Sequence, residues 1–189
     1  VTAIVGMSGS GKTTILKLIQ KFYETYQGDI KIGESSLKYN SPYFWRSITG
    51  SVMQDGFIFS DSIEKNIAVG DEISDYNNLI HACKVANILS FIETLPVGFN
   101  TKIGAEGNGI SAGQKQRLLI ARAVYKNPQF LFFDEATNAL DANNEKAIME
   151  NLQTFFKART VIVVAHRLST VKDADKIIVL ENGEIIEEG

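Results

Sequence analysis

Apolar residues follow two different periods along this chain, and the two periods alternate. Short runs rich in β-branched and aromatic residues predict buried strands, which we place at Thr2–Val5, Asp29–Ile32, Ile48–Met53, Phe130–Asp134 and Thr160–Ala165. Between these runs apolar residues recur every three or four positions, which predicts helices at Thr13–Phe22, Asp75–Thr94, Lys115–Tyr125 and Asn143–Phe156, with a short helical turn at Tyr43–Arg46. Strands that alternate with helices are typical of an α/β domain with a mostly parallel sheet.

The pattern changes in the middle of the chain, where helical periods replace strands. We therefore expect residues 71–127 to form a helical subdomain inserted into an α/β core made of residues 1–70 and 128–189. Near the end, Lys176–Leu180 and Glu184–Glu187 flank Asn182-Gly183, a strong signal for a β-hairpin. The length of 189 residues suits a single domain. Because a domain rarely starts on a buried strand, we expect this chain to be a piece of a longer protein.

Composition narrows the class of protein. An apolar content of 44% excludes a disordered chain, and the longest apolar runs, Phe130–Phe133 and Val161–Ala165, are too short to cross a bilayer. A single cysteine, Cys83, excludes an internal disulfide. The net charge of −3, with no basic stripe, argues against nucleic acid as a partner.

The first strand leads into a glycine-rich loop that fits the pattern G-x-x-x-x-G-K-[ST] at every fixed position. In this pattern backbone N–H groups and the following helix N-terminus cradle phosphate oxygens, a lysine reaches the β- and γ-phosphates, and a hydroxyl ligates Mg²⁺. A chance match in a chain of this length has odds on the order of one in a hundred. The sequence therefore predicts a nucleotide site made of Gly6, Ser8, Gly9, Ser10, Gly11, Lys12, Thr13 and Thr14.

A pair of acids, Asp134 and Glu135, follows the apolar strand Phe130–Asp134. Ligands of open α/β sheets bind beyond the carboxyl ends of the strands. We expect Asp134 to help hold Mg²⁺ and Glu135 to polarise the attacking water. Taken alone, the pair could also simply end a strand at the surface.

Four further segments give the chain a family resemblance. Ile110-Ser111-Ala112-Gly113-Gln114 precedes a helix, Gln54 follows a strand, Ala139-Leu140-Asp141 follows the acidic pair, and His166 follows the strand Thr160–Ala165. With these segments the chain resembles the nucleotide-binding domain of ABC transporters. The family signature is usually L-S-G-G-Q, so this chain departs from it at Ile110 and Ala112. Taken alone, Ser111 could be an ordinary helix cap and His166 a structural histidine.

The resemblance implies a fold and a set of roles. The fold is a P-loop NTPase core of the RecA-like type with an inserted helical subdomain, and the N-terminal β-subdomain would be truncated in this chain. The cofactors would be ATP and Mg²⁺, and two domains would meet head to tail, most simply as a homodimer. The implied catalytic residues are Lys12, Gln54, Glu135 and His166, and the implied metal ligands are Thr13, Gln54 and Asp134. Gln54 and His166 would also contact the nucleotide, and Ser111, Gly113 and Gln114 would bind the partner's ATP in trans.

Two segments, Phe57–Ile67 and Phe91–Phe99, are similar to exporters of this family, and Gln114–Tyr125 is similar to bacterial peptide exporters that are often fused to a cysteine peptidase. Exporter likeness implies transmembrane domains on the same polypeptide, a contact with them through Phe57 and Phe59, and a place at the cytoplasmic face of a bacterial inner membrane. Phe57 and Phe59 could equally be core residues. Exporters usually carry V-G-E-x-G before the signature, whereas this chain has Ile103–Gly107 with Ala105 at the acid position.

Two other functions remain open at this point. One is a soluble ATPase of the same family that works on nucleic acid or ribosomes, which the acidic charge and the lack of a sustained heptad pattern disfavour. The other is a regulatory module that binds nucleotide without hydrolysis, which the presence of Glu135 and His166 disfavours.

Overall fold

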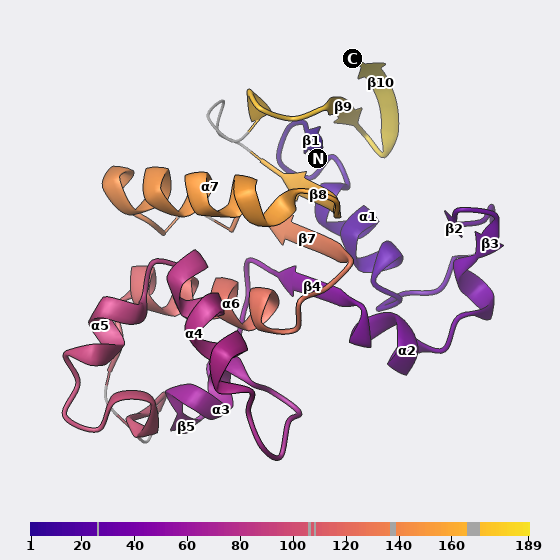
Figure 1. The fold of residues 1–189 in the computed structure, drawn as a ribbon. Helices are drawn as coiled ribbons and strands as arrows, with labels where there is room; N and C mark the ends of the chain where they lie inside the picture. Colours follow the sequence, from indigo (N-terminus) through magenta and orange to yellow (C-terminus); the bar gives the residue numbers. More distant parts are fainter. Residues whose placement is uncertain (26, 106, 108, 137–138, 166–170) are drawn as a thin grey trace.

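The computed structural model describes residues 1–25, 27–105, 107, 109–136, 139–165 and 171–189. A six-stranded sheet in the order β10-β9-β1-β8-β7-β4 forms its centre (Figure 1). The strands are β1 (Thr2–Val5), β4 (Thr49–Val52), β7 (Phe130–Asp134), β8 (Thr160–Val164), β9 (Lys176–Glu181) and β10 (Glu184–Glu188). Neighbouring strands are parallel except for β9 and β10, which form the predicted hairpin. The α/β fold with a mostly parallel sheet is therefore confirmed.

Helices cover both faces of the sheet (Figure 1). The strand β7 shows why, because its residues alternate between two apolar clusters. Leu131 and Phe133 pack into a cluster with α6 (Ala112–Tyr125) and α7 (Ala142–Phe156), whereas Phe132 packs on the other face with Trp45 of α2 (Pro42–Ser47) and Leu16 of α1 (Lys12–Ile19). A parallel sheet that is buried on both faces needs such continuous apolar strands. Its carboxyl edge is the part left for ligands.

The helices α3 (Ile63–Ile67), α4 (Tyr76–Val85), α5 (Leu89–Glu93) and α6 gather on the side of the molecule away from the β9–β10 hairpin (Figure 1). The prediction of one continuous helix at Asp75–Thr94 is wrong in its middle. The helix α4 ends before Asn87, which adopts a left-handed φ of 50°. The Ile88 N–H bonds the Cys83 carbonyl and the Asn87 N–H bonds the Lys84 carbonyl, which is a Schellman C-cap. The five-residue α3 was not predicted from the sequence.

Smaller elements complete the chain. The strand predicted at Asp29–Ile32 is shorter than expected and lies outside the main sheet, because β2 (Lys31–Ile32) pairs only with β3 (Ser35–Ser36). A second short pair joins β5 (Asp61–Ser62) to β6 (Lys102–Ile103), and 3₁₀ turns lie at Leu37–Tyr39 and Gly98–Asn100. Among the described helices, none combines the length and apolar character needed to span a bilayer. The division into core and helical subdomain stays a prediction.

Candidate nucleotide site

The loop between β1 and α1 has the backbone that its glycines permit. Gly9 and Gly11 adopt φ values of 81° and 101°, and Gly11 is the N-cap of α1. These left-handed conformations disfavour any residue with a side chain. A Cβ placed on Gly6 would lie 2.1 Å from the Leu180 carbonyl oxygen, so this position excludes every side chain. Ser8 in the loop and Thr14 in the first turn of α1 are exposed.

The ammonium group of Lys12 lies over this loop. Its Nζ donates to the carbonyl oxygens of Gly6 and Met7 at 2.9 and 2.7 Å, and to the Ser10 hydroxyl at 3.4 Å. Lys12 is buried, so these oxygens replace water around its charge. The arrangement places a positive charge beside the loop. In this motif the N–H groups of the loop surround an anion.

Asp134, at the end of β7, is brought to the first turn of α1. The Thr13 hydroxyl donates to Oδ2 of Asp134 at 2.8 Å, while Oδ1 is buried without a hydrogen-bond partner among the described residues. Burial raises the pKa of Asp134, the Thr13 bond lowers it in part, and the adjacent Glu135 raises it again. Two hard oxygens with an unsatisfied lone pair suit a small divalent cation, and Mg²⁺ commonly takes one or two protein ligands plus phosphate oxygens and water.

Glu135 follows directly and has an unusual backbone, with φ of 52°. Its N–H donates to the Val164 carbonyl at 3.2 Å, which ties the residue to the end of β8. A non-glycine residue in this region is uncommon and is held there by its surroundings. The carboxyl edge of the sheet thus presents Asp134 and Glu135 in sequence, as the acidic pair predicted.

A cavity of about 440 Å³ adjoins Thr13 and Asp134 and also reaches Gln54. Three predicted metal ligands therefore border one space. The cavity is lined by Thr13, Lys17, Phe22, Tyr23, Met53, Gln54, Asp55 and Asp134. Sequence reasoning missed Lys17, Phe22, Tyr23, Met53 and Asp55 as site residues. The available signal for Lys17 was its position on the helix that starts at Lys12, five residues further on. The other residues carried no signal.

The predicted signature residues lie elsewhere, at the start of α6. The Ser111 hydroxyl accepts a hydrogen bond from the Gln114 N–H at 3.1 Å, and the Gln114 side-chain carbonyl accepts one from the Ser111 N–H at 2.8 Å. This capping box fixes the helix start. Ala112 is the first helical residue, so it does not need the freedom of the glycine that usually stands there. Ser111, Gly113 and Gln114 are not among the described residues that line the cavity.

His166, the remaining predicted site residue, lies outside the described residues. The strand β8 that precedes it ends at Val164 beside β1 and β7, whose carboxyl ends carry the loop and the acidic pair.

Phe57 and Phe59 lie on the surface, with 66% and 45% of their area exposed, so the core alternative is wrong. Their rings meet edge to face with centroids 5.3 Å apart. The Arg122 guanidinium of α6 lies 5.3 Å from the Phe59 ring centroid and donates to the Phe57 carbonyl at 2.8 Å. It also donates to the carbonyl of the buried Asn66 at 2.7 Å. The sequence did not reveal that the signature helix supports this aromatic pair.

Known proteins resemble the chain over its full length or most of it. A family model described as ABC transporter matches residues 1–138. The "Toxin RTX-I translocation ATP-binding protein" of Actinobacillus pleuropneumoniae is 48% identical over 189 residues, which are 100% of this chain and 27% of that protein. The "Leukotoxin translocation ATP-binding protein LktB" of Mannheimia haemolytica has the same identity and coverage. The solved structure of "a bacterial Atm1-family ABC exporter with ATP bound" matches with a TM-score of 0.93 and 42% identity, over 100% of this chain and 33% of that one. The chain therefore spans 27% of the length of these curated relatives.

Proposed function

Since this chain belongs to the ABC transporter family as one of its ATP-binding domains, we propose that it hydrolyses ATP as the motor of an exporter. The observation that carries the proposal is the pair formed by Thr13 and Asp134 beside the phosphate loop, with one buried carboxylate oxygen left unpartnered. A site that only bound phosphate would not need a buried, desolvated carboxylate there. The pair is suited to hold a cation against the β- and γ-phosphates.

The roles of the residues follow from these positions. The loop N–H groups and Lys12 bind the triphosphate, and Thr13, Asp134 and Gln54 hold Mg²⁺, which neutralises phosphate charge when bound. The Thr13 proton already points to Asp134, so the oxygen of Thr13 keeps lone pairs for the metal. Glu135 orients a water molecule and accepts its proton as the water oxygen bonds to the γ-phosphorus. The bond from that phosphorus to the bridging oxygen breaks, and ADP and phosphate leave. His166 would contact the γ-phosphate.

A second copy would complete the site. Ser111 and the N-terminus of α6 are exposed, and the Ser111 oxygen accepts a bond from Gln114, which leaves its O–H to donate. Donors at a helix N-terminus suit the excess negative charge of a triphosphate. We therefore assign Ser111, Gly113 and Gln114 to the ATP of a partner in a head-to-tail homodimer. Hydrolysis would remove their target and let the dimer open.

The exposed pair Phe57 and Phe59 is the surface assigned to the transmembrane domains of the same polypeptide. Two neighbouring aromatic side chains exposed to solvent are typical of a contact site. The chain would then lie at the cytoplasmic face of a bacterial inner membrane. The names of the curated relatives refer to toxin translocation, which supports a peptide or protein as the cargo. The acidic net charge gives no support to a nucleic-acid role. The complete acidic pair, Asp134 and Glu135, gives none to a purely regulatory role.

The test is steady-state Mg²⁺-ATP hydrolysis by the purified full-length protein that contains this chain, at increasing protein concentration. The variant Glu135→Gln should keep ATP binding and lose turnover by about 10²–10³, because a group that acts in the transition state is removed. Glu150→Gln, an exposed glutamate of α7, is the matched control and should hydrolyse at the wild-type rate. If Glu135→Gln keeps more than about a tenth of the rate, Glu135 is not the base.

A further inference from the structure

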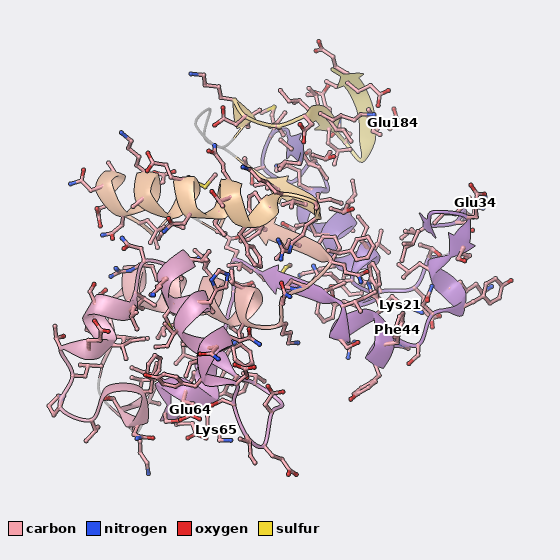
Figure 2. All side chains as sticks on the ribbon, in the orientation of Figure 1. Lys21, Glu34, Phe44, Glu64, Lys65 and Glu184 are labelled. Carbon is pink, nitrogen blue, oxygen red and sulfur yellow. The ribbon has the colours of Figure 1, made fainter. Side chains whose placement is uncertain are left out.

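The turn between β9 and β10 lies behind the phosphate loop. Its two residues, Asn182 and Gly183, both have positive φ values, 50° and 83°, as in the tight turns that suit β-hairpins. The Gly183 N–H donates to the Ser10 carbonyl at 3.0 Å. A Cβ placed on Gly11 would lie 3.7 Å from the Gly183 Cα, so the two backbones are close over more than one atom. In Figure 2 the labelled Glu184 marks the strand that leaves this turn toward solvent.

We propose that Gly183 is a positioning residue for the nucleotide, because its N–H sets the direction of the peptide group between Ser10 and Gly11. A trans peptide is planar, and its C=O and N–H point in opposite directions. When Gly183 holds the Ser10 oxygen behind the loop, the Gly11 N–H turns to the inner side of the loop. This inference rests on the nucleotide site of the proposed function, since that inner side is where phosphate would bind.

Two other carbonyl groups of the loop have partners within the loop or its helix, whereas the Ser10 carbonyl has an outside donor. The Gly6 and Met7 oxygens are held by the Lys12 ammonium, and the Met7 oxygen also accepts from the Ser10 N–H at 3.2 Å. The Ser10 oxygen is held by Gly183, from the far end of the chain. Gly11 is a glycine with φ of 101°, so little steric resistance opposes a flip of this peptide. A flipped peptide would aim an oxygen at the phosphate and replace an attraction by a repulsion.

Gly183 can be changed without a steric clash. A Cβ at this position meets no heavy atom within 4 Å, so Gly183→Ala acts through its positive φ alone. Gly33, in the turn between β2 and β3, offers a matched control with φ of 57° and the same open space. Both substitutions strain the turn of a hairpin, and only the first turn bonds the phosphate loop. Both substitutions at Gly183 keep the backbone N–H, but Asn tolerates left-handed φ better than Ala, so Gly183→Asn should bind ADP as the wild type does.

The experiment measures ADP affinity and Mg²⁺-ATP kinetics of the full-length protein for these variants. Gly183→Ala keeps the N–H but strains the turn that aims it at the Ser10 carbonyl. It should therefore weaken ADP binding by about threefold to tenfold, up to the loss that one hydrogen bond gives. It should raise KM with little change in kcat, since ground-state binding is lost. Gly33→Ala should bind ADP as the wild type does. Equal affinities for Gly183→Ala and the wild type, or an equal loss in Gly33→Ala, would overturn the proposal.

Hydrogen exchange of the wild-type protein keeps the proposal testable if Gly183→Ala does not fold. Coupling between two equilibria is reciprocal. If the hydrogen bond from Gly183 to Ser10 raises ADP affinity by a given factor, ADP binding must stabilise that hydrogen bond by the same factor. Exchange of the Gly183 amide should therefore slow by about threefold or more when ADP saturates the site. An unchanged exchange rate would contradict the proposal. A wild-type protein that binds no ADP would instead refute the proposed function.

Discussion

Asp134 has 1% of its surface exposed and accepts a hydrogen bond from Thr13 at Oδ2, while Oδ1 has no partner among the described residues. Burial raises the pKa of this carboxyl group above its ordinary value of 3.8. An acid whose pKa is raised by folding binds more protons in the folded state than in the unfolded state. Stability therefore falls as the pH rises from the ordinary value through the raised one, and stays reduced above it. A bound cation would offset this loss.

The variant Asp134→Asn should thus be more stable than the wild type at about pH 7 without nucleotide or metal, and the difference should shrink toward about pH 4. Urea unfolding of the 189-residue chain, followed by the fluorescence of its single tryptophan, Trp45, measures the stability at each pH. The same variant should lose Mg²⁺-ATP hydrolysis by about 10²–10³. Asp141→Ala is the contrasting case, because the bonds from Asn144 lower the pKa of Asp141 and cap α7. It should be less stable than the wild type. An Asp134→Asn variant that unfolds at lower urea would contradict the burial argument.

At the scale of elements, the sequence predicted those that depend on local pattern. β7 has the predicted bounds, and the start of α7 follows from Asp141, a good N-cap. α6 begins three residues before the predicted Lys115, because the capping box of Ser111 and Gln114 extends the helix beyond its apolar pattern. The phosphate loop and the acidic pair were equally local, since each is a short run beside a strand.

The features that were missed are an element too short to show a period and contacts between distant segments. α3 is too short to show a helical period, and it is held by Asn66, whose side chain bonds the Phe59, Asp61 and Ser62 carbonyls. The bond from Gly183 to Ser10 joins opposite ends of the chain, and the hairpin signal says nothing about what lies behind the turn. The cavity beside Thr13 likewise needs α1 and the Gln54 segment side by side.

Arg122 gives the element-scale prediction, because it joins α6 to α3 and to the aromatic pair. Burial lowers the pKa of Arg122, and its planar fork makes bonds to Asn66 and Phe57 that an ammonium group cannot reproduce together. Arg122→Lys should lower the free energy of unfolding by about 1–3 kcal/mol and speed hydrogen exchange in residues 57–62. Arg46→Lys is the control, since Arg46 is exposed and stacks on Phe22. It should change stability by no more than about 0.5 kcal/mol. Similar losses in the free energy of unfolding for Arg122→Lys and Arg46→Lys would refute a specific role for the planar guanidinium group of Arg122.

For the whole molecule, the arrangement of half-sites decides how two copies would work. Thr13, which follows Lys12, bonds Asp134 at the carboxyl edge of the sheet, whereas Ser111 starts a helix that is not among the described elements lining the same cavity. In a symmetric head-to-tail dimer, the phosphate-loop half of each chain faces the Ser111 half of its partner. The dimer therefore contains two equal sites. If the site is shared in this way, two different inactive variants must complement each other.

The variants Lys12→Ala and Ser111→Arg test this sharing when they are co-expressed as full-length proteins with different tags. In a mixed dimer one site carries both lesions, and the other combines an intact Lys12 with an intact Ser111. Mixed dimers isolated through both tags should therefore hydrolyse ATP at about half the wild-type rate if the two sites act independently. The control pairs Lys12→Ala with Glu135→Gln, whose lesions lie in the same half of the site, so neither site of that mixed dimer is intact. Mixed dimers of the first pair that are no more active than those of the control would show that Ser111 does not serve the partner's ATP.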